Sequence, residues 1–286
     1  MRQGFLYVIS GADQYFREAR DSVISLRRHS PEAHATLVSD ALPRSLPDLG
    51  SRFDQVVTQP LEPVSGRYVS PHVQGWTYRV RNVYRHSPYD RTCHLDSDTY
   101  FLGDLQPLFA LLDYCDMAMT LAPSHTDLVR VDGQEIVGCA LYNTGMIVFK
   151  KSALTERFFE RWYYWQMQSL DDPAVKGSDQ VTFMRTLLEV PCRVCALHPN
   201  WNARTNGHER FRGPVNLIHG RHADFEGVAG ELNIAPSELR VWIPKVNLCL
   251  YEQMSLAHHI RYCVKATWLL GRASLRRTAR RLLRRS

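Results

Sequence analysis

The strongest constraint on the fold is an alternation of short apolar segments with longer amphipathic ones. Residues 5–10 are apolar and β-branched, residues 13–28 carry apolar side chains at helical spacing, and residues 35–39 are apolar again. Parallel strands need a long crossover, which is usually a helix, so this order favours a parallel sheet. Asp13 or Ala12 is expected to open the first helix, with Asp13 as a reasonable N-cap.

The same alternation continues through the next 180 residues, and no internal repeat interrupts it. The segment 41–72, rich in Pro, Ser and Gly, is expected to be mostly loop. The pattern predicts one α/β domain over residues 1–250, with three layers and a mainly parallel central sheet. Further helices are predicted at 73–86, 104–112, 152–168 and 179–188, and further strands at 92–95, 116–121, 142–150, 193–197 and 215–219.

Composition limits the class of protein. A chain of 286 residues with 44% hydrophobic and 22% charged residues can bury a full core. No apolar run reaches the roughly 18 residues that span a bilayer, and the first ten residues resemble a core strand more than a signal peptide. The seven cysteines are scattered and odd in number, which indicates a reducing compartment. Cys192 and Cys195 would face opposite sides of a strand, so we expect core residues there and no metal site.

The net charge of +6 is unevenly distributed. Residues 1–257 hold 26 basic and 29 acidic residues, whereas residues 258–286 hold nine basic residues and no acid. Apolar residues recur near helical spacing among these arginines, which predicts a cationic amphipathic tail on an anionic membrane surface. A disordered basic tail or a nucleic-acid contact is the alternative, and the interleaved apolar residues favour the membrane.

Two carboxylates, Asp96 and Asp98, follow a short apolar run that Ser87-Pro88 bounds upstream. Strand alternation projects residues i and i+2 to the same side, so both carboxylates can meet one cation. Hard oxygen ligands suit Mg²⁺ or Mn²⁺, and such ions often hold substrate phosphates. The pair therefore predicts a site for a metal-bound diphosphate; two solvated loop acids are the alternative.

Three further groups carry polar chemistry at the ends of predicted elements. Asn143-Thr144-Gly145 precedes a strand, Ser178-Asp179-Gln180 opens a helix, and His219-Gly220-Arg221-His222 ends a strand. The Asn143 amide is suited to hydroxyls, and the helix N-terminus at Asp179 is suited to polar groups. His219 is suited to a metal and Arg221 to phosphate. Taken singly, these groups also fit a turn, a helix cap and a buried histidine.

The order and spacing of the four groups resemble the nucleotide-diphospho-sugar transferases. Among these, the chain is most similar to the retaining enzymes of glycosyltransferase family 8. Residues 87–91 and 197–202 also match, and the resemblance covers about residues 4–235. It implies the GT-A fold and a nucleotide-sugar donor, and the donor that it suggests is a UDP-hexose.

The resemblance also implies roles for individual residues. Asp96, Asp98 and His219 would bind Mn²⁺ or Mg²⁺ and neutralise the leaving diphosphate. Asp179 and Gln180 would lie beside the anomeric carbon as the catalytic pair. The remaining donor contacts would be Ser10 and Gly11 at the base, Arg79 at phosphate or sugar, and Ser97, Asn143, Thr144, Gly145, Gly220 and Arg221.

Two of these assignments have competitors. Arg81 replaces Arg79 if the helix register shifts, and His222 competes with His219, which we prefer because a strand end precedes it. The family often continues from the metal histidine to Lys-Pro-Trp, whereas this chain has Gly220-Arg221-His222. Arg221 is able to take the place of that lysine on phosphate.

The implied activity is transfer of a sugar, with retention, to a glycan, lipid-linked or protein acceptor. Retention is compatible with a front-face route or with a covalent intermediate, and the sequence does not choose between them. With the basic tail, the expectation is a cytoplasmic enzyme, peripheral on the inner membrane face.

Other classes fit less well. Haloacid-dehalogenase-like phosphatases have Thr or Val at the position that Tyr100 occupies here. Sugar-phosphate nucleotidyltransferases have a Gly-rich basic loop after the first strand, which Ser10-Gly11-Ala12-Asp13 does not match. The open alternative is a non-catalytic membrane-surface or nucleic-acid-binding protein on the same fold. The joint presence of Asp96, Asp98, Asp179 and His219 argues against it.

Overall fold

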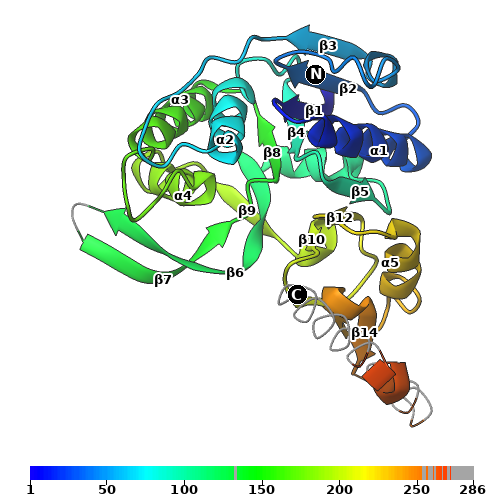
Figure 1. Cartoon of the computed structure of the whole chain (residues 1–286). Helices are drawn as coiled ribbons and strands as arrows, with labels where there is room; N and C mark the ends of the chain where they lie inside the picture. The colour runs from blue at the N-terminus through cyan, green and yellow to red at the C-terminus, as the bar shows by residue number, and fades with distance from the viewer. Residues whose placement is uncertain are drawn as a thin grey trace, which may run out of the picture.

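The computed structural model describes residues 1–131 and 134–252 and, beyond them, the helical positions 256, 260, 262–265, 267–268 and 271. Only the backbone is described at 123–131, 134–139 and 246. The centre of the fold is an eight-stranded, mainly parallel sheet with the strand order β3-β2-β1-β4-β8-β6-β7, and β9 pairs with β6 (Figure 1). The strands are β1 (Gln3–Ile9), β2 (Ala35–Ser39), β3 (Gln55–Thr58), β4 (Arg91–Leu95), β6 (Met117–Val131), β7 (Gln134–Tyr142), β8 (Met146–Lys150) and β9 (Val194–Leu197).

The predicted strand–helix–strand start is confirmed. Strand β1 pairs in parallel with both β2 and β4, and α1 (Asp13–His29) is the crossover from β1 to β2. Of the two expected helix starts, Ala12 is the N-cap, without a side-chain bond, so the cap expected at Asp13 is wrong. Asp13 is the first residue of α1, and its carboxylate accepts from the Ser45 hydroxyl.

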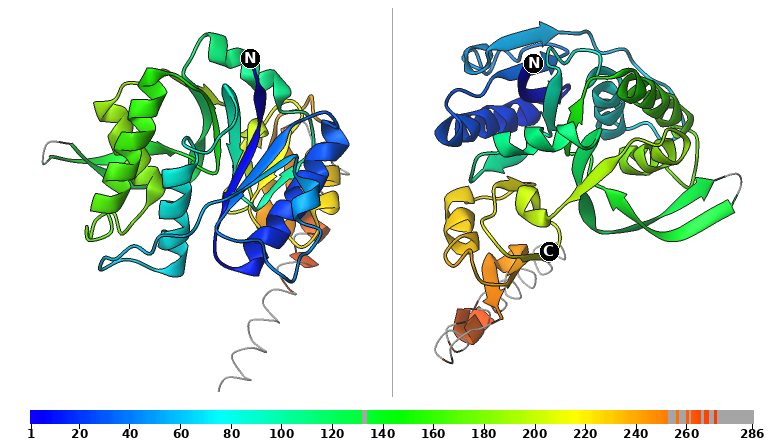
Figure 2. Two further views of the ribbon diagram at one scale, coloured as in Figure 1. Left: turned by 90° about the horizontal axis from the view of Figure 1, so that it is seen from above. Right: turned by 180° about the vertical axis from the view of Figure 1, so that it is seen from behind.

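Helices cover both faces of the sheet. Seen from above, α1 lies on one side, and α2 (Pro71–Asn82), α3 (Ala153–Gln168) and α4 (Asp179–Glu189) lie on the other (Figure 2). Successive residues of a strand point to opposite faces. Accordingly, Phe5 and Tyr7 pack into the core on the α1 side, and Leu6 and Val8 pack into the core on the other side.

A smaller body of strands adjoins this sheet and was not predicted. It has two three-stranded sheets and α5 (Phe225–Leu232), packed around the buried Trp242. The first sheet has β10 (Ala203–Arg204), β12 (Leu217–His219) and β5 (Thr99–Phe101), and the second has β11 (Glu209–Phe211), β13 (Arg240–Ile243) and β14 (Leu248–Tyr251). Antiparallel pairing of β5 with β12 sets Thr99 opposite His219.

The other differences from the sequence prediction are local. Strand β3 lies in the predicted 41–72 loop, and the predicted strand at 142–150 is divided by a turn at 143–145 into the end of β7 and β8. The predicted helix at 104–112 is the 3-10 helix η2 (Gln106–Asp113); the other 3-10 segments are η1 (Gly50–Arg52), η3 (Pro199–Trp201) and η4 (Pro244–Val246). The predicted helix start at Ser152 is confirmed, because its hydroxyl accepts from the Thr155 N–H in a capping box.

The predicted amphipathic tail, 258–286, lies mostly outside the described residues. Of its apolar positions, Ile260, Val264 and Trp268 are described, and all three are exposed. In the described part of the chain, no helix has the length and apolarity that crossing a membrane requires.

Candidate active site

A pocket of about 410 Å³ opens at the carboxyl ends of β1 and β4. This edge of an open α/β sheet is where such folds bind ligands. Twelve of the predicted site residues line the pocket, while Gly11 and Gly145 do not. The twelve are Ser10, Arg79, Asp96, Ser97, Asp98, Asn143, Thr144, Asp179, Gln180, His219, Gly220 and Arg221.

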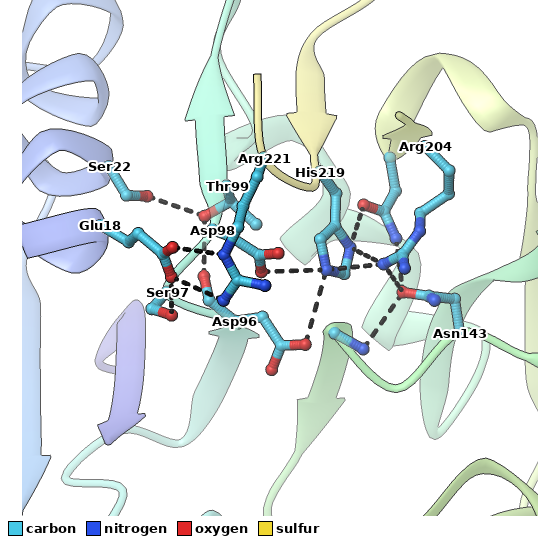
Figure 3. Close-up of polar contacts among 12 residues, drawn as sticks. Glu18, Ser22, Asp96, Ser97, Asp98, Thr99, Asn143, Arg204, His219 and Arg221 are labelled. Atoms are coloured by element: carbon cyan, nitrogen blue, oxygen red, sulfur yellow. Dashed lines mark hydrogen bonds and ion pairs between the residues drawn. The ribbon is translucent and has the colours of Figure 1, made fainter. Parts of the chain in front are cut away.

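The three predicted metal ligands converge in this pocket. One ligand atom each from Asp96, Asp98 and His219 lies within 4.8 Å of the others. His219 Nε2 is 3.5 Å from Asp96 Oδ2 and 3.5 Å from Asp98 Oδ1 (Figure 3). We expected strand alternation to bring the two carboxylates together, and this reason is wrong. Asp96 and Asp98 stand in the turn between β4 and β5, not on a strand. The Gly220 N–H donates to the Asp98 carbonyl at 2.7 Å, which holds the β12 end against this turn.

The surroundings of this group fit a divalent cation. Two carboxylates and one imidazole form a donor set that suits Mn²⁺ or Mg²⁺. Gly145 packs against it so closely that a Cβ there would lie 2.6 Å from Asp96 Oδ2 and would overlap the His219 ring. A side chain at Gly145 would therefore fill the space beside the ligand atoms.

The two competing assignments are separated by position. His222 is outside the pocket, and its Nδ1 lies 2.9 Å from the Asp224 carbonyl. Arg81 pairs with Glu62 on the surface, whereas Arg79 lines the pocket. The structure thus brings His219 and Arg79 to the carboxylates.

Arg79 connects the two acidic parts of the pocket. Its side chain is buried, and its guanidinium donates to Asp96 Oδ1 and Asp179 Oδ2. Burial disfavours the charge of Arg79, but Asp96 and Asp179 outweigh this effect and raise its pKa further. Thr144 Oγ1 also donates to Asp179 Oδ2 at 2.7 Å.

The carboxylates of the metal group are held in their charged form. Burial disfavours the charge of Asp96, but Arg79 and His219 outweigh it, so the pKa of Asp96 lies well below its usual range. Burial likewise opposes ionisation of Asp98, and the hydrogen bond with His219 outweighs it and lowers the pKa. Both groups are therefore acceptors at neutral pH.

Asp179 is fixed at the first turn of α4. It is 3% exposed, and its backbone carbonyl accepts from Trp162 Nε1 at 3.1 Å. Gln180, the next residue, lines the same pocket. The sequence pattern predicted the helix start, and the resemblance implied that this pair lies in the site.

Arg221 reaches the pocket from the loop after β12 but is held by Glu18 on α1. Its Nε donates to Glu18 Oε1 at 2.6 Å and its Nη2 to Oε2 at 3.2 Å. Ser97 Oγ donates to the same carboxylate at 3.2 Å (Figure 3). The predicted phosphate ligand thus has an acidic partner at the rim.

Sequence reasoning missed a third arginine in the pocket, Arg204. Its Nη1 lies 2.6 Å from both ring nitrogens of His219 and 3.4 Å from Asn143 Oδ1. Strand β10 pairs with β12 so that Arg204 is opposite His219. The only sequence signal was its position two residues after the matched segment 197–202. The other lining residues that were missed are Val8, Ile9, Tyr15, Pro71, His72, Gly75, Trp76, Thr205 and Asn206.

No protein-family model and no curated protein sequence matches this chain. Solved structures do match it. Mouse xyloside xylosyltransferase 1, in its apo form, has a TM-score of 0.51 at 14% identity over 77% of this chain and 98% of that one. The chain has the GT-A fold.

Two further glycosyltransferases support this fold assignment. The apo structure of the bifunctional glycosyltransferase WbbM has a TM-score of 0.54 at 15% identity, over 78% of this chain and 46% of that one. Galactosyltransferase LgtC, in complex with donor and acceptor sugar analogues, has a TM-score of 0.50 at 13% identity, over 77% and 87%. The chain spans about half of WbbM and most of the other two. The predicted fold is confirmed.

Proposed function

We propose that this chain is a metal-dependent glycosyltransferase that takes a sugar from a nucleotide-sugar donor. The observation that carries the proposal is the convergence of Asp96, Asp98 and His219 in a pocket at the ligand-binding edge of a GT-A fold. A non-catalytic protein on this fold would have no need of that donor set beside Asp179 and Gln180.

Asp96, Asp98 and His219 would hold Mn²⁺ or Mg²⁺. When bound, the ion supplies positive charge for the diphosphate leaving group. Arg204 lies against the same histidine and adds a fixed positive charge there. Arg221 would exchange Glu18 for a phosphate oxygen, since a guanidinium binds either anion in two-point fashion.

The donor would extend from the end of β1 to the start of α4. Ser10 and Gly11 follow β1, where the base would lie, Thr144 donates to Asp179, and Asn143 lines the same pocket. Hydroxyl and amide groups at that place suit a sugar ring. Two of the similar structures are named as a galactosyltransferase and a xylosyltransferase, so we propose a UDP-sugar, with a UDP-hexose tested first.

Asp179 and Gln180 are the proposed catalytic residues, and we propose transfer with retention. Arg79 holds the Asp179 carboxylate beside Thr144 at the donor-sugar end of the pocket. A fixed negative charge there would stabilise positive charge that develops at the anomeric carbon. Both retaining routes are compatible with this placement.

We propose a membrane-surface role for the tail. Ile260, Val264 and Trp268 in the tail, and Leu256 just before it, are exposed and recur at the four-residue spacing of one helix face. Seven arginines follow in residues 272–285, which lie outside the described residues. Such a segment would attach the enzyme to anionic lipid on the cytoplasmic face, close to a lipid-linked, glycan or protein acceptor.

Calorimetry of UDP binding with and without Mn²⁺ tests the proposal. We expect binding that depends on Mn²⁺ and is lost in Asp98→Asn, which keeps the side-chain shape and removes one charged ligand. Asp224→Asn, outside the pocket, is the control and should bind as the wild type does. Equal binding without metal, or in Asp98→Asn, would contradict a metal-held diphosphate.

A further inference from the structure

His219 has a second ring nitrogen that faces away from the metal group. Its Nδ1 lies 3.0 Å from Oδ1 of Asn202, whose side chain is fully buried. Its Nε2 is the atom that faces Asp96 and Asp98. An imidazole binds a cation only through an unprotonated nitrogen, so the position of its proton decides whether Nε2 can serve.

The hydrogen bonds around Asn202 determine which end of its amide faces His219. The Gly145 backbone N–H lies 3.1 Å from Asn143 Oδ1 and is able only to donate, so Asn143 presents an acceptor there. Asn202 Nδ2 lies 3.0 Å from that oxygen and 3.0 Å from Thr120 Oγ1. Only an NH₂ group donates to both, which leaves the Asn202 oxygen facing His219.

The orientation of Asn202 in turn requires a proton on His219 Nδ1. An amide oxygen only accepts, so the bond at 3.0 Å needs an Nδ1–H donor. In the neutral ring Nε2 then carries the lone pair, directed at the space between Asp96 and Asp98. Arg204 Nη1, which only donates, lies 2.6 Å from both ring nitrogens and therefore does not distinguish the two tautomers.

We propose that Asn202 is a positioning residue that holds His219 in the Nδ1–H tautomer and so presents Nε2 to the cation. Asn143 takes part, because its oxygen fixes the amide of Asn202. The cation itself rests on the proposed function. The tautomer does not, since it follows from contacts within the chain.

The test is long-range ¹H–¹⁵N NMR of the full chain with ¹⁵N-labelled histidine, without metal and at about pH 8. The signal of His219 is identified by its loss in His219→Gln. We expect the Nδ1–H pattern in the wild type and in Asn202→Asp, which keeps an acceptor oxygen. In Asn202→Leu, which has no acceptor, we expect a shift to the Nε2–H pattern and a roughly 10- to 100-fold weaker Mn²⁺ affinity.

Thr120→Val is the matched control, because it removes another partner of Asn202 and leaves the acceptor for His219 in place. It should keep the wild-type tautomer. An Nε2–H pattern in the wild type, or an unchanged pattern in Asn202→Leu, would overturn the proposal. If Asn202→Leu does not fold, the wild-type spectrum decides alone. The Nδ1–H pattern in a chain without metal-dependent nucleotide binding would refute the proposed function and uphold the role of Asn202.

Discussion

At the scale of residues, Arg79 links the stability of the chain to the charges of the pocket. It is buried between Asp96 and Asp179, so removing it leaves two carboxylates without their counter-charge. Breaking a buried pair costs about 3 to 5 kcal/mol, because the remaining charge stays desolvated. We therefore expect Arg79→Met to lower the free energy of unfolding by about 3 kcal/mol or more, as measured by urea denaturation.

Arg81 is the matched control for Arg79. It lies two residues away on α2 and pairs with Glu62, whose side chain is 59% exposed. An exposed pair contributes roughly 0 to 1 kcal/mol, so Arg81→Met should have a small effect. Equal losses in both variants would show that Arg79 does not neutralise a buried site.

Glu209 predicts a pH dependence of stability. It is buried, its Oε2 accepts the Arg204 N–H at 2.7 Å, and burial raises its pKa from 4.5 to about 7. The folded chain holds this proton more tightly than the unfolded chain, so the stabilisation is complete below pH 4.5 and is lost as pH rises through about 7. Glu209→Gln keeps an acceptor for the Arg204 N–H and does not ionise.

The expected result is a stability difference that grows with pH. Glu209→Gln should exceed the wild type by about 2 kcal/mol near pH 8 and equal it near pH 4, measured by urea unfolding at both values. Glu238→Gln, at an exposed position, should show no such trend. A difference that stays constant across this range would refute the assignment.

The site residues that the sequence predicted are those whose side chains suit the chemistry and that stand at the end of a predicted strand or helix. Asp96, Asp98 and Asp179 directly follow or open predicted elements, so their place at the sheet edge was accessible from sequence. Arg204 and Asn202 were not, because only the pairing of β10 with β12 brings them to His219. A two-residue strand has no periodicity that could reveal it.

At the scale of elements, the turn from β7 to β8 leaves no room for a side chain beside the metal group. Gly145 stands where any Cβ would overlap the His219 ring and crowd Asp96. We expect Gly145→Ala to displace one of these ligands and to weaken Mn²⁺ binding by at least about 10-fold in a calorimetric titration.

Gly230 on α5 is the control, since a Cβ there meets nothing within 4 Å. Gly230→Ala should leave metal binding unchanged and should stabilise the helix by roughly 0.5 to 1 kcal/mol. Normal Mn²⁺ affinity in Gly145→Ala would show that the cation lies elsewhere.

Elements with a strong local pattern were predicted well, and elements that depend on partners were not. The amphipathic spacing in α1 and the capping box of α3 are local signals that survive in the structure. Strand β3 has four residues, half-exposed at the sheet edge, within a Pro-rich stretch. Its strand state comes from pairing with β2, which no local propensity encodes.

At the scale of the whole molecule, charge is divided between an acidic body and a basic tail. If the tail lies on anionic lipid, replacing Arg276, Arg277, Arg280 and Arg281 by Gln should remove most of the binding. Each arginine near the surface contributes about 1 kcal/mol, so four should weaken it by several hundred-fold. Co-sedimentation with phosphatidylserine vesicles measures the loss.

A variant with Gln at four exposed body arginines has the same change in net charge. Arg17, Arg44, Arg85 and Arg212 serve for this purpose. It should sediment as the wild type does, and activity on a water-soluble acceptor should be unchanged in both variants. Equal loss in both would attribute binding to net charge and not to the tail.

The main sheet was predictable as a whole because strand and helix alternate along the chain. The smaller body was not, because its strands have only two to four residues and depend on pairing with one another, as β12 does with β5. This body carries His219, so the metal group is complete only when both parts have folded. His219 stands at the end of the strand predicted at 215–219, and the resemblance added the expectation that it binds the metal.

The most direct test of the account is release of nucleotide from a panel of nucleotide sugars, with and without Mn²⁺, beside Asp98→Ala. The account predicts Mn²⁺-dependent release from one donor, with a UDP-hexose the first candidate, and loss of that release in the variant. Equal release in Asp98→Ala, or no release from any donor together with no metal-dependent nucleotide binding, would contradict it.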